Sequence, residues 1–288
     1  MNQILDITQQ PWAGGTEPYV SVLITTFNHQ EYIGRCIDSI LEQKRPFPIE
    51  ILILDDASSD STQEIILSYA TKFPEIIKPF LQVKNLYSQL IKGMPKLIEN
   101  ARGAYIAYCD GDDFWTDPEK LVKQVTFLEV NPSFVLTFHN TINVDQSGLV
   151  ISEPYAPHDG KYEFSMEELT VRPSSWLHLG TLLFRNVPIV FPPEYNLMPN
   201  GDCFVPMLLS EFGGAKFQHE IGPLAYRQHN SGSFSAKSIE EKVRMQLQTE
   251  LQITAYYIRR NEISVAQKFA AQHLIPHLRT NLSIVINN

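Results

Sequence analysis

Apolar and polar residues alternate along the first 131 residues in a pattern that predicts strands and helices in turn. Short runs rich in β-branched or aromatic residues predict buried strands at 20–25, 49–54, 76–81 and 105–109. Apolar residues at helical spacing predict helices from 33 to a stop at Pro46, around 65–69, at 87–100 and from about 119 onward. Near-continuous apolar strands separated by helices are typical of a mostly parallel sheet covered on both faces.

Beyond Asn131 the pattern changes to a mixture of strands and helices. Residues 134–151 predict a strand and then a polar hairpin turn from Asp145 to Gly148. A proline-rich loop, 191–199, leads to a helix that we expect to begin near Asp202 and to stop at the glycine pair 213–214. The second half is therefore expected to be mixed α and β.

The segment from Ile239 to Ile286 predicts two helices broken near Asn261, each with one apolar stripe. Acidic and basic residues are balanced on the polar faces, which favours burial against protein over a bilayer surface. We expect a helical hairpin packed on the rest of the chain, with a homodimer through these helices as the weaker alternative. The stripe residues are Val243, Leu247, Leu251, Thr254 and Ile258, then Ala266, Phe269, Ala270, His273 and Leu274.

Composition and charge narrow the class of protein. The 288 residues are 43% hydrophobic, as in globular chains, and the formal charge of −9 argues against a nucleic-acid partner. Cys36, Cys109 and Cys203 have no paired spacing and predict reduced thiols. There is no secretory signal pattern and no window of about 18 apolar residues. We expect a cytoplasmic protein whose membrane contact, if it has one, is peripheral at the inner face.

Three carboxylates crowd the end of the strand at 105–109, namely Asp110, Asp112 and Asp113. Like charges this close repel one another unless a cation lies among them. Hard divalent cations prefer oxygen ligands, and an Asp-x-Asp at the carboxyl end of a parallel strand suits a nucleotide diphosphate bridged through a metal. The alternative is that Asp113 and Asp117 cap the helix that follows.

Four segments together resemble the family 2 glycosyltransferases, which are inverting enzymes of the GT-A fold. They are "VSVLITTFNHQEYIGRCIDSILEQ", "EILILDDASSDSTQEII", "ARGAYIAYCDGDDFW" and "YRQHNSGSFS". The resemblance implies an α/β fold with a Rossmann-like, mostly parallel central sheet flanked by helices. It also implies an N-terminal extension (1–18), a GT-A domain (19–237) and a C-terminal helical appendage (238–288). Within the domain, residues 19–131 would bind the nucleotide and 132–237 would face the acceptor.

The resemblance implies a nucleotide site at the strand ends. Asp56 would accept a hydrogen bond from the base, and a carboxylate accepts from the N3–H of uracil or thymine, which favours a UDP- or dTDP-sugar. Thr25 and Phe27 match the positions that line the base, and Asp110 would lie toward the ribose. Asp55 has an open alternative role as a structural Asx-turn residue.

The resemblance also implies a metal site and a general base. Asp112 would bind the Mg²⁺ or Mn²⁺ ion that bridges the two phosphates, and His229 would bind that metal or a phosphate. Asp202 would take the proton of the acceptor hydroxyl, unless it is only a helix N-cap. Gly201 stands where the family usually has the first acid of a pair, which puts acceptor recognition in question. His139 and His178 are expected to be core or cleft-wall histidines.

These expectations add up to an inverting, metal-dependent glycosyltransferase. It would move one sugar from a nucleotide-diphospho-sugar to a glycan or lipid-linked glycan in cell-surface polysaccharide or oligosaccharide synthesis. A haloacid-dehalogenase-like phosphotransferase is one alternative, although Asp113-Phe114 follows the motif where that class wants Thr or Val. A non-catalytic sugar-nucleotide-binding relative is another, which the presence of Asp112 and Asp202 disfavours. No dinucleotide-binding or P-loop glycine motif occurs.

Overall fold

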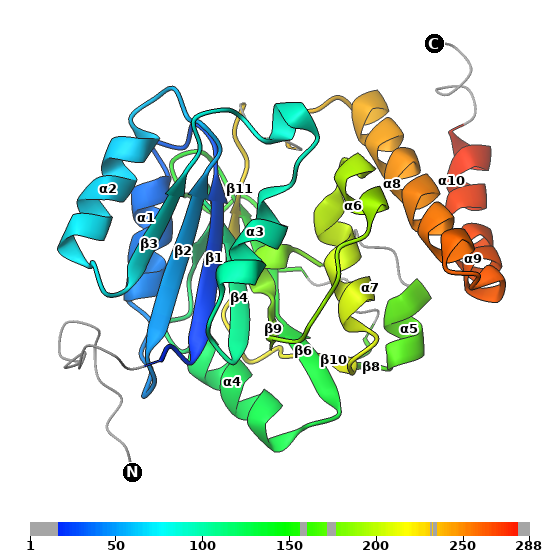
Figure 1. Cartoon of the computed structure of the whole chain (residues 1–288), viewed down its shortest axis with the longest axis horizontal. Helices are drawn as coiled ribbons and strands as arrows, with labels where there is room; N and C mark the ends of the chain where they lie inside the picture. The colour runs from blue at the N-terminus through cyan, green and yellow to red at the C-terminus, as the bar shows by residue number, and fades with distance from the viewer. Residues whose placement is uncertain (1–16, 156–159, 172–176, 231, 233–234, 282–288) are drawn as a thin grey trace.

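A computed structural model describes residues 17–155, 160–171, 177–230, 232 and 235–281. Within these ranges the main sheet has the strand order β3-β2-β1-β4-β9-β6-β10-β8. The β1, β2, β3 and β4 strands are parallel, as predicted, whereas β9 runs antiparallel to both β4 and β6 (Figure 1). The strands are β1 (Val20–Thr26), β2 (Ile49–Asp55), β3 (Ile77–Leu81), β4 (Tyr105–Asp110), β6 (Phe134–Phe138), β8 (Glu163–Phe164), β9 (Leu183–Arg185) and β10 (Gly214–Phe217).

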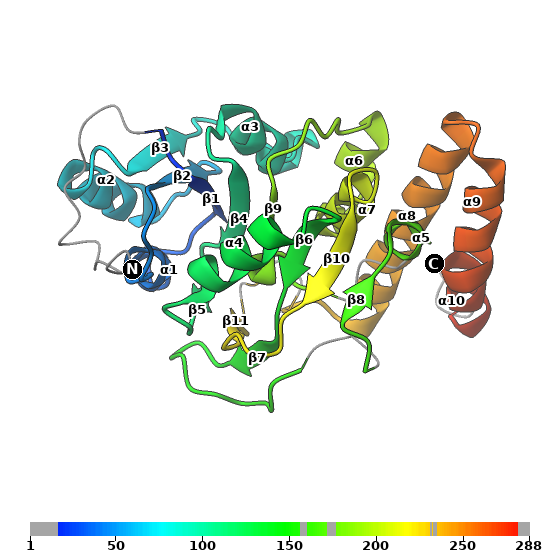
Figure 2. The same ribbon diagram turned by 90° about the horizontal axis from the view of Figure 1, so that it is seen from below.

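Helices cover both faces of this sheet, because successive buried side chains of each strand point to opposite faces (Figure 2). In β1, Val22 and Ile24 pack with α1 (Ile33–Leu41), α2 (Thr62–Lys72) and α4 (Lys120–Val130). Leu23 between them packs in the second core cluster with α3 (Gly93–Asn100) and α7 (Val205–Leu209). The α/β fold class predicted from the sequence is therefore confirmed.

Two helix predictions were wrong in extent. The helix expected over 87–100 is a 3₁₀ turn (Tyr87–Gln89) followed by α3, because Leu90 adopts a left-handed backbone with φ 56°. The helix expected from Asp202 to Gly213 begins as a 3₁₀ turn, η5 (Gly201–Phe204), and α7 then ends at Leu209. Gly214 instead opens β10, where an added Cβ would lie 2.5 Å from the Phe164 carbonyl oxygen.

A second, small sheet lies at the carboxyl end of β4. Its order is β5 (Phe114–Trp115), β11 (Leu224–Arg227), β7 (Thr141–Val144), with β11 parallel to β7 and antiparallel to β5. The predicted hairpin turn follows β7: the Gly148 N–H donates to the Asp145 carbonyl at 2.9 Å, and Gly148 has φ +91°. This sheet ties the second half of the chain to the loop after β4.

The C-terminal helices form a hairpin at the edge of the molecule, beside α6 (Pro193–Leu197), as Figure 1 shows. The α8 helix (Ile239–Arg259) is followed two residues later by Asn261, which has φ 62°, so the predicted break is confirmed. The second helix comprises α9 (Ile263–Phe269), a π-helical turn (Ala270–Leu274) and α10 (Ile275–Thr280). Its predicted end at Ile286 lies outside the described residues.

Protein covers much of the hairpin, as expected. Ile253, Tyr256 and Phe269 share a buried cluster with side chains of α6 and α7, and Arg259 forms a bidentate ion pair with Glu194 of α6 at 2.6 and 3.0 Å. None of the helices in the described part of the chain is both long and apolar enough to cross a bilayer. The boundary at residue 237 stays a prediction.

The predicted stripe on α8 was partly wrong. Leu251 and Ile258 are 50% and 55% exposed, whereas Ile253, Tyr256 and Tyr257 are buried. The predicted stripe, one residue in every four, missed the buried face of α8 because this helix packs against α6 on one side and α9 on another. Tyr256 and Tyr257, whose side chains are both apolar and polar, form part of that buried face.

Candidate active site

The carboxyl ends of β1 and β4 bring together Thr25 and Asp110, which are partners in the parallel register. The Thr25 hydroxyl donates to Asp110 Oδ1 at 3.2 Å and also contacts the Tyr108 hydroxyl. Tyr108 donates to the same Asp110 oxygen at 2.7 Å. Burial, and next the charge of Asp112, raises the pKa of Asp110 to about 7. The predicted pair Thr25 and Asp110 thus forms one hydrogen-bonded unit.

Gly111 allows the carboxylate loop to close against β1. Its N–H donates to the Thr25 carbonyl at 3.0 Å, and an added Cβ would lie 2.6 Å from Thr26 Oγ1 and 3.1 Å from His29 Nδ1. Contacts below 3 Å to a buried hydroxyl leave no room for a side chain. The glycine therefore holds Asp110 and Asp112 next to the loop that follows β1.

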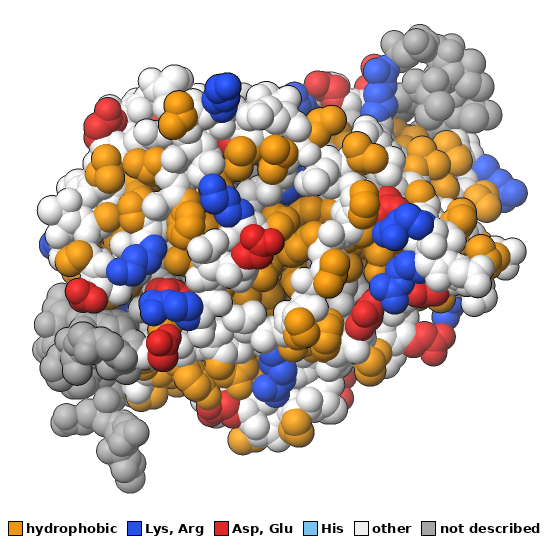
Figure 3. Space-filling view, viewed as in Figure 1, with side chains coloured by type: hydrophobic (Ala, Val, Ile, Leu, Met, Phe, Trp, Pro, Cys, Tyr) orange, Lys and Arg blue, Asp and Glu red, His pale blue; other side chains and the backbone are white. Residues whose placement is uncertain are grey.

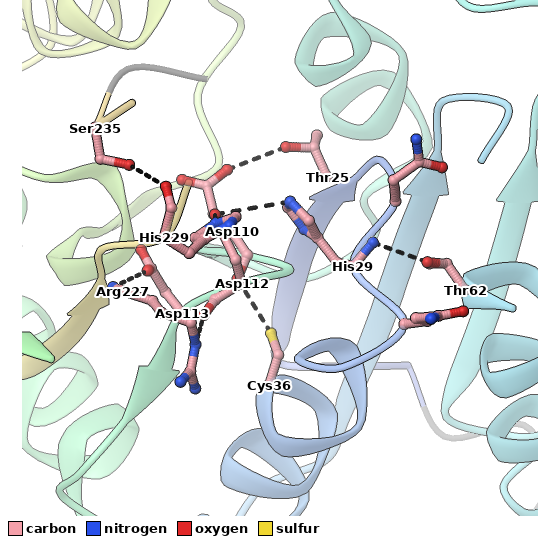
Figure 4. Close-up of polar contacts among 12 residues, drawn as sticks. Thr25, His29, Cys36, Thr62, Asp110, Asp112, Asp113, Arg227, His229 and Ser235 are labelled. Carbon is pink, nitrogen blue, oxygen red and sulfur yellow. Dashed lines mark hydrogen bonds and ion pairs between the residues drawn. The ribbon is translucent and has the colours of Figure 1, made fainter. Parts of the chain in front are cut away.

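Asp112 lies between two histidines from distant segments, and Figure 4 shows the three side chains pointing toward one another. The His229 Nε2 is 3.0 Å and the His29 Nε2 is 3.7 Å from Asp112 Oδ2. One ligand atom from each residue lies within 4.8 Å of the others. Burial acts to raise the pKa of Asp112, but the His229 hydrogen bond and the charges of His29 and His229 leave it below its usual range.

The chemistry of these side chains fits a divalent cation. A carboxylate with two imidazoles is a donor set for Mn²⁺ and other transition metals. Burial lowers the pKa of His29, and its Nδ1 is buried without a hydrogen-bond partner among the described residues. His29 was not predicted, although it follows the first strand within the same polar stretch as Phe27.

Arg227 positions the carboxylate loop rather than neutralising it. Its backbone N–H donates to Asp113 Oδ1 and its Nε to the Asp112 carbonyl, both at 2.8 Å. Another guanidinium nitrogen, Nη1, donates to the carbonyls of Asp145 and Gln146. Asp113 is therefore no helix cap, and burial, with the charge of Asp112 next, holds its pKa well above its usual range.

Asp117 lies at the start of α4, where the capping alternative put it, although the N-cap residue itself is Glu119. Its Oδ1 accepts from the Glu119 N–H at 2.8 Å at the start of α4, and its Oδ2 pairs with Lys123 at 2.8 Å. Asp113 and Asp117, which were considered together as caps, thus have different roles. Asp117 stabilises a helix start, and Asp113 anchors β11 through Arg227.

Asp55 and Asp56 also have different roles. Asp55 is buried and its Oδ1 accepts from the Ser58 N–H at 2.9 Å, so its role is structural, although the bond reaches three residues on and not the two of an Asx turn. Asp56 accepts from the backbone N–H groups of Leu86 and Tyr87 at 2.5 and 3.1 Å. Each of its oxygens keeps a second lone pair that could accept from a nucleobase. Phe27, at 45% exposure, presents its ring to solvent.

Asp202 lies in η5, between α6 and α7. The N-cap of η5 is Asn200, so Asp202 is not an N-cap. The residue is exposed, yet the protein around its carboxyl group raises the pKa, while the Cys203 N–H and the Lys92 charge act to lower it. Its charge also raises the pKa of Asp110, after burial and Asp112, which places the two carboxylates in one electrostatic field.

Lys92 and Tyr195 occupy the space next to Gly201. The Lys92 Nζ donates to the Pro199 carbonyl at 3.2 Å. A Cβ on Gly201 would lie 3.0 Å from the Tyr195 ring and 3.5 Å from Lys92 Cε. The aromatic ring thus fills the volume of the absent acidic side chain. Figure 3 shows the surface hollowed between α3 and α6, where apolar side chains gather.

Known proteins share parts of this sequence and its fold. The family model described as Glycosyl transferase family 2 matches residues 21–173. An uncharacterised protein of Mycobacterium tuberculosis is 33% identical over 180 residues, covering 62% of this chain and 51% of the relative. The putative teichuronic acid biosynthesis glycosyltransferase TuaG of Bacillus subtilis is 33% identical over 134 residues, covering 46% and 51%. The chain therefore spans about half the length of these curated relatives.

Solved structures show the same fold at low identity. S. aureus TarS with UDP-GlcNAc has a TM-score of 0.63 at 17% identity, over 91% of this chain and 72% of that one. The mannosyltransferase PcManGT from Pyrobaculum calidifontis with GDP-Man and Mn²⁺ has a TM-score of 0.62 at 16% identity, over 96% and 78%.

Proposed function

The chain belongs to glycosyl transferase family 2, and on that premise we propose that it transfers a sugar from a nucleotide-diphospho-sugar to a glycan with inversion. One observation carries the proposal. His29, Asp112 and His229 come from three separate segments of the chain, yet one ligand atom from each lies within 4.8 Å of the others. This cluster would hold the metal of a donor site, and an inverting displacement also requires a base on the acceptor side, for which we propose Asp202. Family membership also disfavours the dehalogenase-like alternative.

The proposed donor is a UDP- or dTDP-sugar. Asp56 would accept the N3–H of uracil or thymine, and Phe27 would stack on the base. The TarS structure contains UDP-GlcNAc and the PcManGT structure contains GDP-Man, so this fold accepts donors with different nucleotides. Asp56 therefore carries this part of the proposal.

The proposed cofactor is Mn²⁺ or Mg²⁺. Asp112 and His229 would hold it, with His29 as the third side chain of the cluster. When bound, the ion neutralises charge that builds on the departing diphosphate. Asp110 would hydrogen-bond the ribose, and Arg227 would keep the carboxylate loop in place through its bond to the Asp112 carbonyl.

Asp202 is the proposed general base. It would take the proton of the acceptor hydroxyl while that oxygen attacks the anomeric carbon. The positive charge of Lys92 favours the ionised form of Asp202 in a site that is otherwise rich in carboxylates. Tyr195, in the place of the usual first acid, would narrow the acceptor side next to Gly201.

The proposed acceptor is a glycan or lipid-linked glycan of a cell-surface polysaccharide, as the name of the TuaG relative suggests. Cytoplasmic location, peripheral membrane contact at the inner face and dimerisation through α8–α10 are parts of the same proposal. This proposal includes no nucleic-acid partner, because the formal net charge of the chain is −9.

A nucleotide-sugar panel tests the proposal. Thermal unfolding of the full chain is recorded with UDP-, dTDP-, GDP- and CMP-sugars, with and without Mn²⁺. A donor at 100 times its dissociation constant should stabilise the fold by about 2.7 kcal/mol. Asp112→Ala should abolish the Mn²⁺-dependent part of that stabilisation, and Asp117→Ala, at the start of α4, should keep it. Stabilisation by none of the nucleotides would reject the function. Binding without turnover on any glycan would favour a non-catalytic relative.

A further inference from the structure

A group of neutral polar side chains lies beside the carboxylate loop and takes no part in the steps above. We call it the polar shelf, and it comprises Asn143, Tyr155, His178 and Tyr226. Asn143 of β7 is paired in register with Tyr226 of β11, so their side chains share one face of the small sheet. The backbone of Tyr155 bridges Thr141 on the other side of β7, and its hydroxyl donates to Asn143 Oδ1 at 3.1 Å.

His178 completes the shelf. Its Nε2 is 3.0 Å from the Tyr155 oxygen, and its ring centroid is 4.5 Å from that of Tyr226. Because the Tyr155 proton goes to Asn143, the Tyr155 oxygen accepts from His178 Nε2–H, which leaves Nδ1 as an acceptor. Burial lowers the pKa of His178 to about 4 and raises that of Tyr155 to about 12. The shelf therefore carries no charge near pH 7.

The elements that carry the shelf are fastened to the reaction site. Arg227, the residue after Tyr226, bonds Asp113 and the Asp112 carbonyl at 2.8 Å. Gly180, two residues after His178, accepts from Trp115 Nε1 at 2.9 Å. Tyr155 is 38% exposed, so the shelf opens to solvent and is not core packing.

We propose that the polar shelf binds a hexose ring, either the sugar of the donor or that of the acceptor. The inference rests on the proposed function for the reaction that the sugar enters. A hexose has an apolar C–H face, which packs on aromatic rings, and a rim of hydroxyls, which need neutral donors and acceptors. The tyrosine rings supply the first, and the phenol, amide and imidazole groups supply the second. The carboxylates of Asp110, Asp112 and Asp113 next to the shelf disfavour an anionic ligand.

Two variants that keep the ring volume test the shelf, Tyr226→Phe and Tyr155→Phe, with circular dichroism to confirm folding. The donor arm compares, by calorimetry with Mg²⁺, the affinity for UDP with that for UDP-glucose and UDP-N-acetylglucosamine. The second arm uses NMR to measure saturation transfer from the UDP-bound protein to free glucose and to free N-acetylglucosamine. Tyr162→Phe is the matched control, because Tyr162 is 43% exposed and its ring contacts Phe217 and His219 instead.

The expected result is an unchanged UDP affinity and a sugar-dependent signal that falls about three- to tenfold, as for one lost hydrogen bond. A fall in the donor arm assigns the shelf to the transferred sugar. A fall in the second arm alone assigns it to the acceptor sugar. Unchanged signals in both arms for both variants would overturn the inference. The UDP titration reads the nucleotide site and the hexose arms read the shelf, so failures of the two proposals are separable.

Discussion

Lys120 makes the stability of the protein depend on pH in a predictable direction. Its side chain is buried at 1% exposure, with Nζ 2.8 Å from Gln124 Oε1 and 4.1 Å from the centroid of the Trp115 ring. Burial lowers the pKa of Lys120 to about 7. The unfolded chain keeps the ordinary value near 10.5, so between about pH 7 and pH 10 it binds one proton more than the native state does.

The free energy of unfolding should therefore rise with pH across this window. One proton corresponds to about 1.4 kcal/mol per pH unit, so the Lys120 contribution between pH 8 and pH 9.5 is about 2 kcal/mol. Below about pH 7 the folded and unfolded states are both protonated, and the contribution no longer changes. Lys120→Met gives a buried side chain of similar length that binds no proton. It should therefore abolish this part of the increase in unfolding free energy with pH, and stabilise the protein near neutral pH.

Urea unfolding of wild type and variant at pH 8 and pH 9.5 measures the effect, because the difference between the two slopes cancels the other titrating groups. Lys123→Met is the control: Lys123 is partly exposed, and its ion pair with Asp117 helps to raise its pKa against the effect of burial. It should leave the rising slope in place. Equal slopes for wild type and Lys120→Met would show that Lys120 keeps its proton in the native state, and would refute the reasoning.

Three further predictions concern the site and the hairpin. Asp202→Asn should bind donor and metal but turn over at least about 10²-fold more slowly, and unchanged turnover in a product assay would remove it as the base. Gly201→Asp should cost about 1–3 kcal/mol in urea unfolding, because its Cβ would lie 3.0 Å from the Tyr195 ring; equal stability would show that the ring yields freely. Truncation after Lys237 should expose the surface under α8 and give a destabilised or aggregating protein by light scattering. A monodisperse, equally stable product that no longer binds vesicles would instead identify a membrane anchor.

The sequence predicted the strands of the first half to within a residue or two at each end, and α1 begins at Ile33 as expected but ends at Leu41, before the expected stop at Pro46. These elements are buried on a whole face or on both, so their local apolar pattern carries the signal. The prediction for residues 87–100 failed because the left-handed Leu90 interrupts an amphipathic pattern that would otherwise suit a helix. The Leu251 stripe failed because α8 packs against both α6 and α9, so its buried face differs from a single four-residue repeat.

The sequence by itself determined which polar side chains meet at the carboxyl ends of the first strands. Parallel strands place their carboxyl ends at one edge of the sheet, so Thr25 and Asp110 had to meet once their strands were recognised. Only the tertiary structure decided that His29 joins Asp112 and His229, that Arg227 bonds carbonyls, and that His178 reaches Tyr226. These contacts join loops far apart in the chain. Their positions depend on how helices and strands pack, which no local period of apolar residues encodes.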